Sequence, residues 1–144
     1  MTQFVIDASV AAKWFLPRSG EPLAKEAVRL LAGYADGRYR FAVPDLFWAE
    51  CGNILWKAYR QGRWSRSMAE EAILAINDRS FPTTPSLDLL EEAFNIAATF
   101  DRTVYDSLYV ALAVRLNADL VTADERLANA LAAHLPVKWL GSVV

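Results

Sequence analysis

Short apolar runs alternate with longer amphipathic segments along this chain, a pattern typical of strands that alternate with helices. Strands are predicted at residues 3–6 and 39–43, within RSFPTTP, within ADLVTAD, and at 137–140. Helices are predicted at residues 9–15, 23–34, 46–61, 67–78, 86–100 and 104–116, and from Asp124 to about His134. Strands separated by helices or helix pairs indicate a parallel α/β sheet covered on both faces.

Turn and cap residues set the predicted boundaries of these elements. Ser9 and Asp45 are candidate N-caps, because a short polar side chain directly before a helix accepts a bond from its free N–H groups. Pro44 should stop the second strand, and Gly62 should end the helix that follows it. The chain shows no repeat, linker or low-complexity tract, so its 144 residues are expected to form a single domain.

The composition narrows the classes of protein to which this chain can belong. Hydrophobic residues make up 54% and charged residues 22%, which fits a well-packed globule and excludes a disordered chain. The net charge of −2 gives no overall basic field for nucleic acid, although a local basic patch would suffice. No signal peptide or membrane-length apolar run is recognisable, so the expected location is cytoplasmic and no membrane partner is expected.

Four carboxylates stand where their neighbours should be buried. Asp7 follows the apolar run FVI and Asp124 follows LVTA, so both are placed at the carboxyl ends of central strands, where open parallel sheets bind ligands. Glu50 and Asp106 are predicted in helix interiors among apolar residues. Burying an unpaired charge is costly, and the helix around Asp106 carries no nearby lysine or arginine between 104 and 114. A divalent cation with oxygen ligands would compensate these charges.

Each acid also has an ordinary structural explanation. Asp7 and Asp124 would be helix N-caps in the commoner role of aspartate after a strand. Capping does not explain Glu50 and Asp106 if both are mid-helix, and that raises the combined case for a metal site.

Four motifs carry a family resemblance. VIDASV, PDLFWAECGNIL, YDSLYVALA and LVTADERL occur in the order and spacing of PIN-domain nucleases, and the chain most resembles the VapC-type toxins of toxin–antitoxin pairs. The resemblance runs from residue 4 to about residue 140 and implies a three-layer α/β/α sandwich with a mostly parallel sheet of about five strands. It places the acid quartet of the family on Asp7, Glu50, Asp106 and Asp124, around one or two Mg²⁺ or Mn²⁺ ions. Supporting polar positions fall on Ser9, Asn53 and Thr122.

The resemblance also implies the activity. Such proteins cut RNA within the chain with a metal-activated water, form homodimers and are neutralised by a small antitoxin whose tail enters the active-site groove. Without a cation, the four acids should repel one another and raise each other's pKa.

Basic and aromatic residues suggest where RNA or a partner binds. Lys57, Arg60, Arg63 and Arg66 recur every three residues, either as a phosphate-contacting stripe or as a solvated helix end. Lys13 and Arg18 follow Asp7 closely and are further candidates for phosphate contacts, with Lys57 and Arg60. Six aromatic residues exceed what one small core needs and hint at a partner surface. They are Trp14, Phe15, Phe47, Trp48, Trp56 and Trp64.

The chain lacks the residues that other catalytic mechanisms require. His134 is the only histidine and should face solvent, and Cys51 is the only cysteine and should be a packing residue. Gly-rich phosphate loops and HExxH are absent. Three alternatives stay open: a stand-alone RNA-processing nuclease, a non-catalytic PIN-like module, and an acidic Mg²⁺-binding signalling domain of flavodoxin-like topology.

Overall fold

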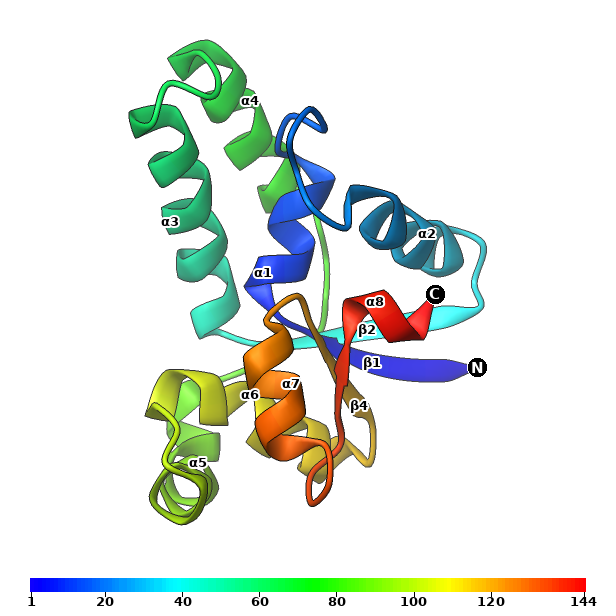
Figure 1. Ribbon diagram of the computed structural model, residues 1–144, viewed down its shortest axis with the longest axis vertical. Helices are drawn as coiled ribbons and strands as arrows, with labels where there is room; N and C mark the ends of the chain where they lie inside the picture. The colour runs from blue at the N-terminus through cyan, green and yellow to red at the C-terminus, as the bar shows by residue number, and fades with distance from the viewer.

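A five-stranded sheet with every neighbouring pair of strands parallel forms the centre of the computed structural model, which describes residues 1–144 (Figure 1). The strand order is β3-β2-β1-β4-β5, so β1 is central. The strands are β1 Thr2–Ile6, β2 Tyr39–Pro44, β3 Thr83–Thr84, β4 Asp119–Thr122 and β5 Val137–Trp139. All five predicted strands are present.

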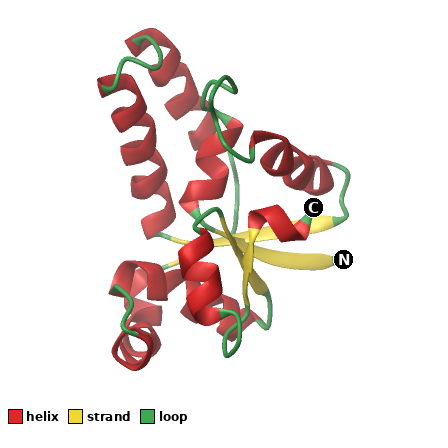
Figure 2. Ribbon diagram, in the orientation of Figure 1, coloured by secondary structure: helices red, strands yellow, loops and turns green.

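Helices cover both faces of the sheet, as Figure 2 shows. They are α1 Ala8–Ala11 with the 3₁₀ turn η1 Ala12–Trp14, α2 Ala24–Ala35, α3 Leu46–Arg60, α4 Arg66–Asn77, α5 Ser86–Phe100, α6 Val104–Leu116, α7 Glu125–Leu131 and α8 Leu140–Val143. The helices α5, α6 and α7 lie on one face and α1 and α2 on the other, while α3 and α4 project as a hairpin (Figure 1). The predicted three-layer α/β/α sandwich is confirmed, and its sheet is entirely parallel.

The apolar helix α6 packs against the three central strands. It contacts β1, β2 and β4, and every residue from Ser107 to Ala113 is buried. A helix that is apolar on all sides has to be buried on most of them. Because α6 spans the middle of the sheet, the side chains at its first turn come close to the carboxyl end of β1.

The turn between α3 and α4 follows from a single glycine. Gly62 adopts φ +78°, and its N–H donates to Tyr59 O while the Arg63 N–H donates to Ala58 O, both at 2.9 Å. These two bonds form the Schellman arrangement that ends a helix with a left-handed residue. The predicted helix end at Gly62 is confirmed, and the chain reverses there into α4.

Several predicted details differ in the structure. Ser9 lies inside α1 and does not cap it, and Asp45 occupies the N-cap position of α3 without a side-chain cap bond. Helix α7 ends at Leu131, three residues before His134, which is exposed. The last strand ends at Trp139, and an additional short helix, α8, follows.

Most of the surplus aromatic residues belong to the core, contrary to the idea of an aromatic partner surface. Phe47 and Trp64 are buried, and Trp14 is stacked on Phe41 with ring centroids 5.8 Å apart. Phe15 and Trp48 pack against the same core. Trp56 alone of the six is largely exposed, at 48%. A small sheet covered on both faces therefore uses these rings to fill its two layers.

No helix of the structure is long and apolar enough to cross a membrane.

Two helical glycines allow a test of packing between α2 and β2. A Cβ at Gly33 would meet the ring of Tyr39 at 2.2 Å, whereas a Cβ at Gly52 would meet only Ile73 at 3.9 Å. Gly33→Ala should lower the free energy of unfolding by about 1–2 kcal/mol, because overpacking outweighs the gain in helix propensity. Gly52→Ala is the matched control and should be neutral or stabilising. Urea unfolding of both variants measures this, and equal effects would contradict the close packing of Tyr39 on α2.

Candidate active site

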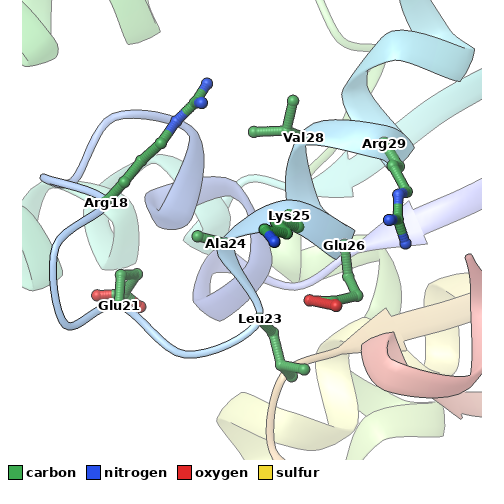
Figure 3. Close-up of a pocket in the computed structure, with 8 residues that line it drawn as sticks. All are labelled: Arg18, Glu21, Leu23, Ala24, Lys25, Glu26, Val28 and Arg29. Carbon is green, nitrogen blue, oxygen red and sulfur yellow. The ribbon is translucent and has the colours of Figure 1, made fainter.

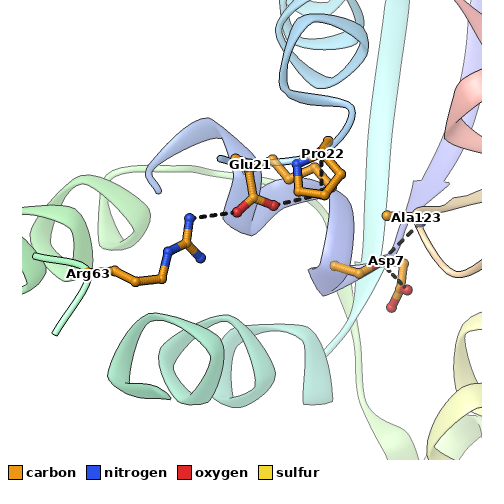
Figure 4. Close-up of polar contacts among 7 residues, drawn as sticks. Asp7, Glu21, Pro22, Arg63 and Ala123 are labelled. Carbon is orange, nitrogen blue, oxygen red and sulfur yellow. Dashed lines mark hydrogen bonds and ion pairs between the residues drawn. The ribbon is translucent and has the colours of Figure 1, made fainter. Parts of the chain in front are cut away.

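Asp7 ends the central strand with its carboxylate fixed by two hydroxyl groups. Its Oδ2 accepts hydrogen bonds from Ser9 Oγ at 2.6 Å and from Thr122 Oγ1 at 2.8 Å. Ser9 Oγ in turn accepts a bond from the Ala123 N–H at 3.1 Å (Figure 4). Asp7 holds the N-cap position of α1, but its side chain makes no cap bond, so capping does not explain it. These contacts join the carboxyl ends of β1 and β4.

Asp124 does cap a helix. Its Oδ1 accepts a hydrogen bond from the Leu127 N–H at 3.2 Å at the start of α7, and its own N–H donates to Thr122 Oγ1 at 3.1 Å. The ordinary capping interpretation therefore holds for this acid. Capping uses one carboxylate oxygen, and the exposed side chain keeps the other for a ligand.

Glu50 is held by a residue that the sequence reasoning missed. Glu50 lies in the interior of α3 as predicted, and its Oε1 accepts a hydrogen bond from the Tyr109 hydroxyl at 2.6 Å. Tyr109 belongs to α6 and is only 2% exposed. Burial keeps the pKa of Tyr109 far above its ordinary value, so its hydroxyl remains a donor. The available signal was a phenol one helical turn after Asp106, within the mostly apolar stretch of α6.

Asp106 corrects a prediction, since it is not mid-helix. It is the third residue of α6, and its N–H donates to the Oγ1 of the N-cap residue Thr103 at 3.1 Å. A carboxylate in the first turn is stabilised by the helix dipole. The helix start thus accounts in part for this acid, whereas Asp7 makes no side-chain cap bond and Glu50 lies in a helix interior.

The pKa shifts show that the four acids lie within electrostatic reach of one another. Burial, with a smaller contribution from the charges of Glu50 and Asp106, raises the pKa of Asp7 to about 6, although the bonds from Ser9 and Thr122 lower it. Burial also raises the pKa of Glu50, as does the charge of Asp106, although the Tyr109 bond opposes this. The pKa of Asp106 is raised by burial and then by Asp124, with Arg102 acting against them. The predicted mutual repulsion is present.

The donor set fits a hydrated divalent cation better than a closed cage. No three His, Cys, Asp or Glu side chains are grouped closely enough to hold an ion by themselves. Mg²⁺ commonly keeps several waters and uses only one or two carboxylates, and oxygen is its preferred donor. Carboxylates that are partly buried, mutually repelling and without a paired base match this demand. Asp7, Glu50, Asp106 and Asp124 are therefore the residues that would hold such an ion.

The three predicted supporting residues, Ser9, Asn53 and Thr122, differ in whether they contact an acid of the site. Thr122 and Ser9 both bond directly to the Asp7 carboxylate and are part of the site. Asn53 is exposed on α3, and its side chain makes no hydrogen bond in the structure. Cys51 is fully buried and packs in the core, in agreement with its predicted role.

The basic stripe around Gly62 does not persist in three dimensions. Arg63 binds Glu21 at 2.9 Å (Figure 4), and Arg66 binds Glu70 at 2.8 Å on the exposed surface of α4, so both arginines are paired with carboxylates. Lys57 and Arg60 remain free of carboxylates at the end of α3, and the Arg60 guanidinium lies 5.4 Å from the Trp56 ring centre. The continuous phosphate stripe is therefore broken, and Lys57 and Arg60 are its two members that no carboxylate pairs.

Lys13 is not available as a phosphate contact. It is 8% exposed, and its Nζ donates to Glu21 Oε2 at 2.7 Å and to Pro22 O at 2.6 Å. This buried amine anchors the loop before α2, which corrects the expectation drawn from its closeness to Asp7 in sequence. Arg18 is exposed and unpaired in the same loop, where it lines a hollow of about 600 Å³ at the start of α2 (Figure 3). None of the four acids lines that hollow.

The raised pKa of Asp7 predicts how stability depends on pH. The pKa of Asp7 is about 6 in the folded state against an ordinary value of 3.8, so stability falls as pH rises from 3.8 to about 6, and the full cost persists above that pH. In EDTA, Asp7→Asn should gain about 2 kcal/mol over wild type between about pH 4 and 7.5. Urea unfolding across this range measures the difference, with exposed Asp88→Asn as control. A constant difference across the range would contradict the shift.

The Tyr109–Glu50 bond gives a second prediction. Tyr109→Phe leaves Glu50 without its donor and should lower the free energy of unfolding by about 1 kcal/mol while keeping the packing of the ring. Tyr105→Phe removes an exposed hydroxyl from the same helix and should change nothing. Chemical unfolding of both variants compares them, and the bond contributes nothing if the two curves coincide.

The chain matches the PIN domain model over residues 4–131. It is 29% identical to ribonuclease VapC3 of Pyrobaculum aerophilum over 129 residues, 88% of this chain and 93% of that protein. The crystal structure of PAE2754 from Pyrobaculum aerophilum has a TM-score of 0.69 at 24% identity, covering 97% of this chain and 85% of the other.

A toxin–antitoxin complex from Klebsiella pneumoniae contains a chain with a TM-score of 0.62 at 16% identity, covering 93% of this chain and 94% of its own length. At these identities the solved structures establish a common fold. The family match extends over most of the sequence, including all four acids. The chain belongs to the PIN-domain family.

Proposed function

We propose that this protein is a divalent-metal-dependent endoribonuclease and the toxin of a toxin–antitoxin pair. The observation that carries the proposal is the convergence of four carboxylates at the carboxyl end of the sheet, where burial and neighbouring acids raise the pKa values of Asp7, Glu50 and Asp106. Such a site favours a cation, and a cation among acids suits phosphodiester hydrolysis. The relative named ribonuclease VapC3 supports RNA as the substrate.

The chain's own residues would position the reaction. When bound, one or two Mg²⁺ or Mn²⁺ ions would supply an activated water and would neutralise charge on the phosphate. Asp7 is the most rigid ligand, because Ser9 and Thr122 fix its Oδ2 and leave Oδ1 without a hydrogen bond. The Tyr109 hydroxyl orients Glu50 through Oε1, and the second carboxylate oxygen of Glu50 would be free to hold the ion or its water. Asp106 and Asp124 complete the acidic rim at two helix starts.

The partners in this proposal are an RNA strand, a cognate antitoxin and a second copy of the chain. A stripe of exposed apolar residues on α5 offers a surface for a subunit contact: Leu87 is 82% and Phe94 is 62% exposed, with Leu90 between them. The toxin–antitoxin complex with the same fold supports the antitoxin. A gene for a small protein beside this one would agree with the toxin role, and its absence would favour stand-alone RNA processing.

More distant RNA contacts are proposed at Arg18, Lys57 and Arg60. Arg60 lies ten residues beyond Glu50 on the same helix, about 15 Å along its axis. These side chains would meet RNA several nucleotides from the cleaved bond, and they would contribute salt-dependent affinity without sequence preference.

Cleavage of total cellular RNA by the purified protein tests the function. Discrete fragments should appear with Mg²⁺ or Mn²⁺ and disappear with EDTA, and Asp106→Asn should reduce cleavage by at least about 100-fold, because it removes a ligand for the ion. Asp88→Asn is the matched control, since Asp88 is likewise the third residue of its helix but is exposed on α5.

A thermal melt separates binding from catalysis. Mn²⁺ should raise the melting temperature of wild type and of Asp88→Asn, and raise that of Asp106→Asn much less. A folded protein that neither cleaves RNA nor responds to any divalent ion would refute the proposed function.

A further inference from the structure

Arg102 lies two residues before the first residue of α6, next to the cap residue Thr103, and the reaction proposed above gives it no role. We propose that Arg102 binds an RNA phosphate beside the acidic site and seats the backbone next to Asp106. This inference rests on the proposed function and names one further residue that contacts the substrate.

The backbone fixes Arg102 between two helix ends. The preceding residue, Asp101, ends α5 in a left-handed conformation with φ 56°, and the Arg102 N–H donates to Ala97 O at 3.2 Å. The following residue, Thr103, caps α6 and binds the Asp106 N–H. Arg102 is therefore held four residues before an acid of the site, on a rigid turn.

The guanidinium of Arg102 is left without a partner. Its Nε is buried and makes no hydrogen bond, and no carboxylate lies within 4.0 Å of its nitrogens, since it appears in none of the six ion pairs. A buried donor on a charged group is costly unless an acceptor reaches it. Asp101 is adjacent in sequence and Asp106 lies one helical turn away, yet neither carboxylate accepts a hydrogen bond from the Arg102 side chain. The two terminal nitrogens of Arg102 also make no hydrogen bond and are not buried, so an anion can reach them.

The charge of the site requires a basic residue close by. The four acids repel an RNA backbone, and ions at the acids compensate only part of that repulsion. Six of the other fourteen lysines and arginines form ion pairs with carboxylates. Lys13, Arg63, Arg66 and Arg115 each bind a glutamate. Arg102 forms no ion pair and stands four residues before Asp106.

The chemistry of the side chain suits a phosphate. Arginine presents a planar fork of donors that matches two phosphate oxygens, and its charge does not depend on pH in the ordinary range. A phosphate held by Arg102 on one side would leave the adjacent phosphodiester facing Asp106 and the other acids. The recognised group is the backbone, so the contact should be independent of base sequence.

RNA binding in a non-cleaving background tests the inference. Fluorescence anisotropy with labelled single-stranded RNA of mixed sequence would compare Arg102→Gln, Arg102→Lys and Arg40→Gln, each in Glu50→Gln with Mg²⁺ present. Arg40 is an exposed arginine at the opposite end of β2 and serves as the control. Gel analysis would confirm that the RNA stays intact.

Arg102→Gln should raise the Kd about tenfold and make the slope of log Kd against log salt shallower by about 0.7, the loss of one single-strand phosphate contact. Arg102→Lys should keep the slope, and Arg40→Gln should match the parent. An Arg102→Gln variant with the parent's Kd and slope would overturn the inference, even if its melting temperature or cleavage rate had changed. The proposed function fails separately, by the absence of metal-dependent cleavage in wild type.

Discussion

Asp7 places a carboxylate at the end of the central strand, where both neighbouring strands and a buried helix exclude much of the water. Burial raises its pKa to about 6, and two hydroxyl groups hold its Oδ2 without removing its charge. An acid in this position is favourable only if something positive joins it or a proton stays on it. Ser9 and Thr122 stabilise the charge of Asp7 with hydrogen bonds, whereas Glu50 and Asp106 raise its cost.

Three different local structures bring the acids to one edge. Asp7 ends a strand, Asp106 and Asp124 stand in or before the first turns of α6 and α7, and Glu50 projects from the interior of α3. Parallel strands all point their carboxyl ends to the same edge, so the segments that follow them start there together. Helix starts also favour negative charge, which lowers the cost of keeping acids there. The fold thus stabilises an acidic cluster that would otherwise oppose folding.

The buried ion pairs on the other side of the site have a structural role. Glu21 is 9% exposed and binds both Lys13 and Arg63, so it ties the loop before α2 to the turn that ends α3. This triad uses two cations that the sequence alone offered for RNA. Arg102, which no motif singled out, is the basic side chain left unpaired beside the acids.

The sequence by itself determined the strand and helix order, the parallel sheet and the acids at its edge, because hydrophobic period, turn residues and motif spacing are local properties. It also determined that Gly62 would end α3, since few other residues adopt that conformation without strain. Only the tertiary structure decided which polar groups meet, as Tyr109 does with Glu50 and Lys13 with Glu21. It also decided that most of the six aromatic residues pack in the core. It also showed Asp106 to be a helix-start residue, because helix boundaries depend on caps such as Thr103 whose bonds form only in the folded chain. Contacts between residues far apart in sequence depend on how the layers of the fold pack together. The amino-acid pattern of one segment does not identify the segment against which it will pack.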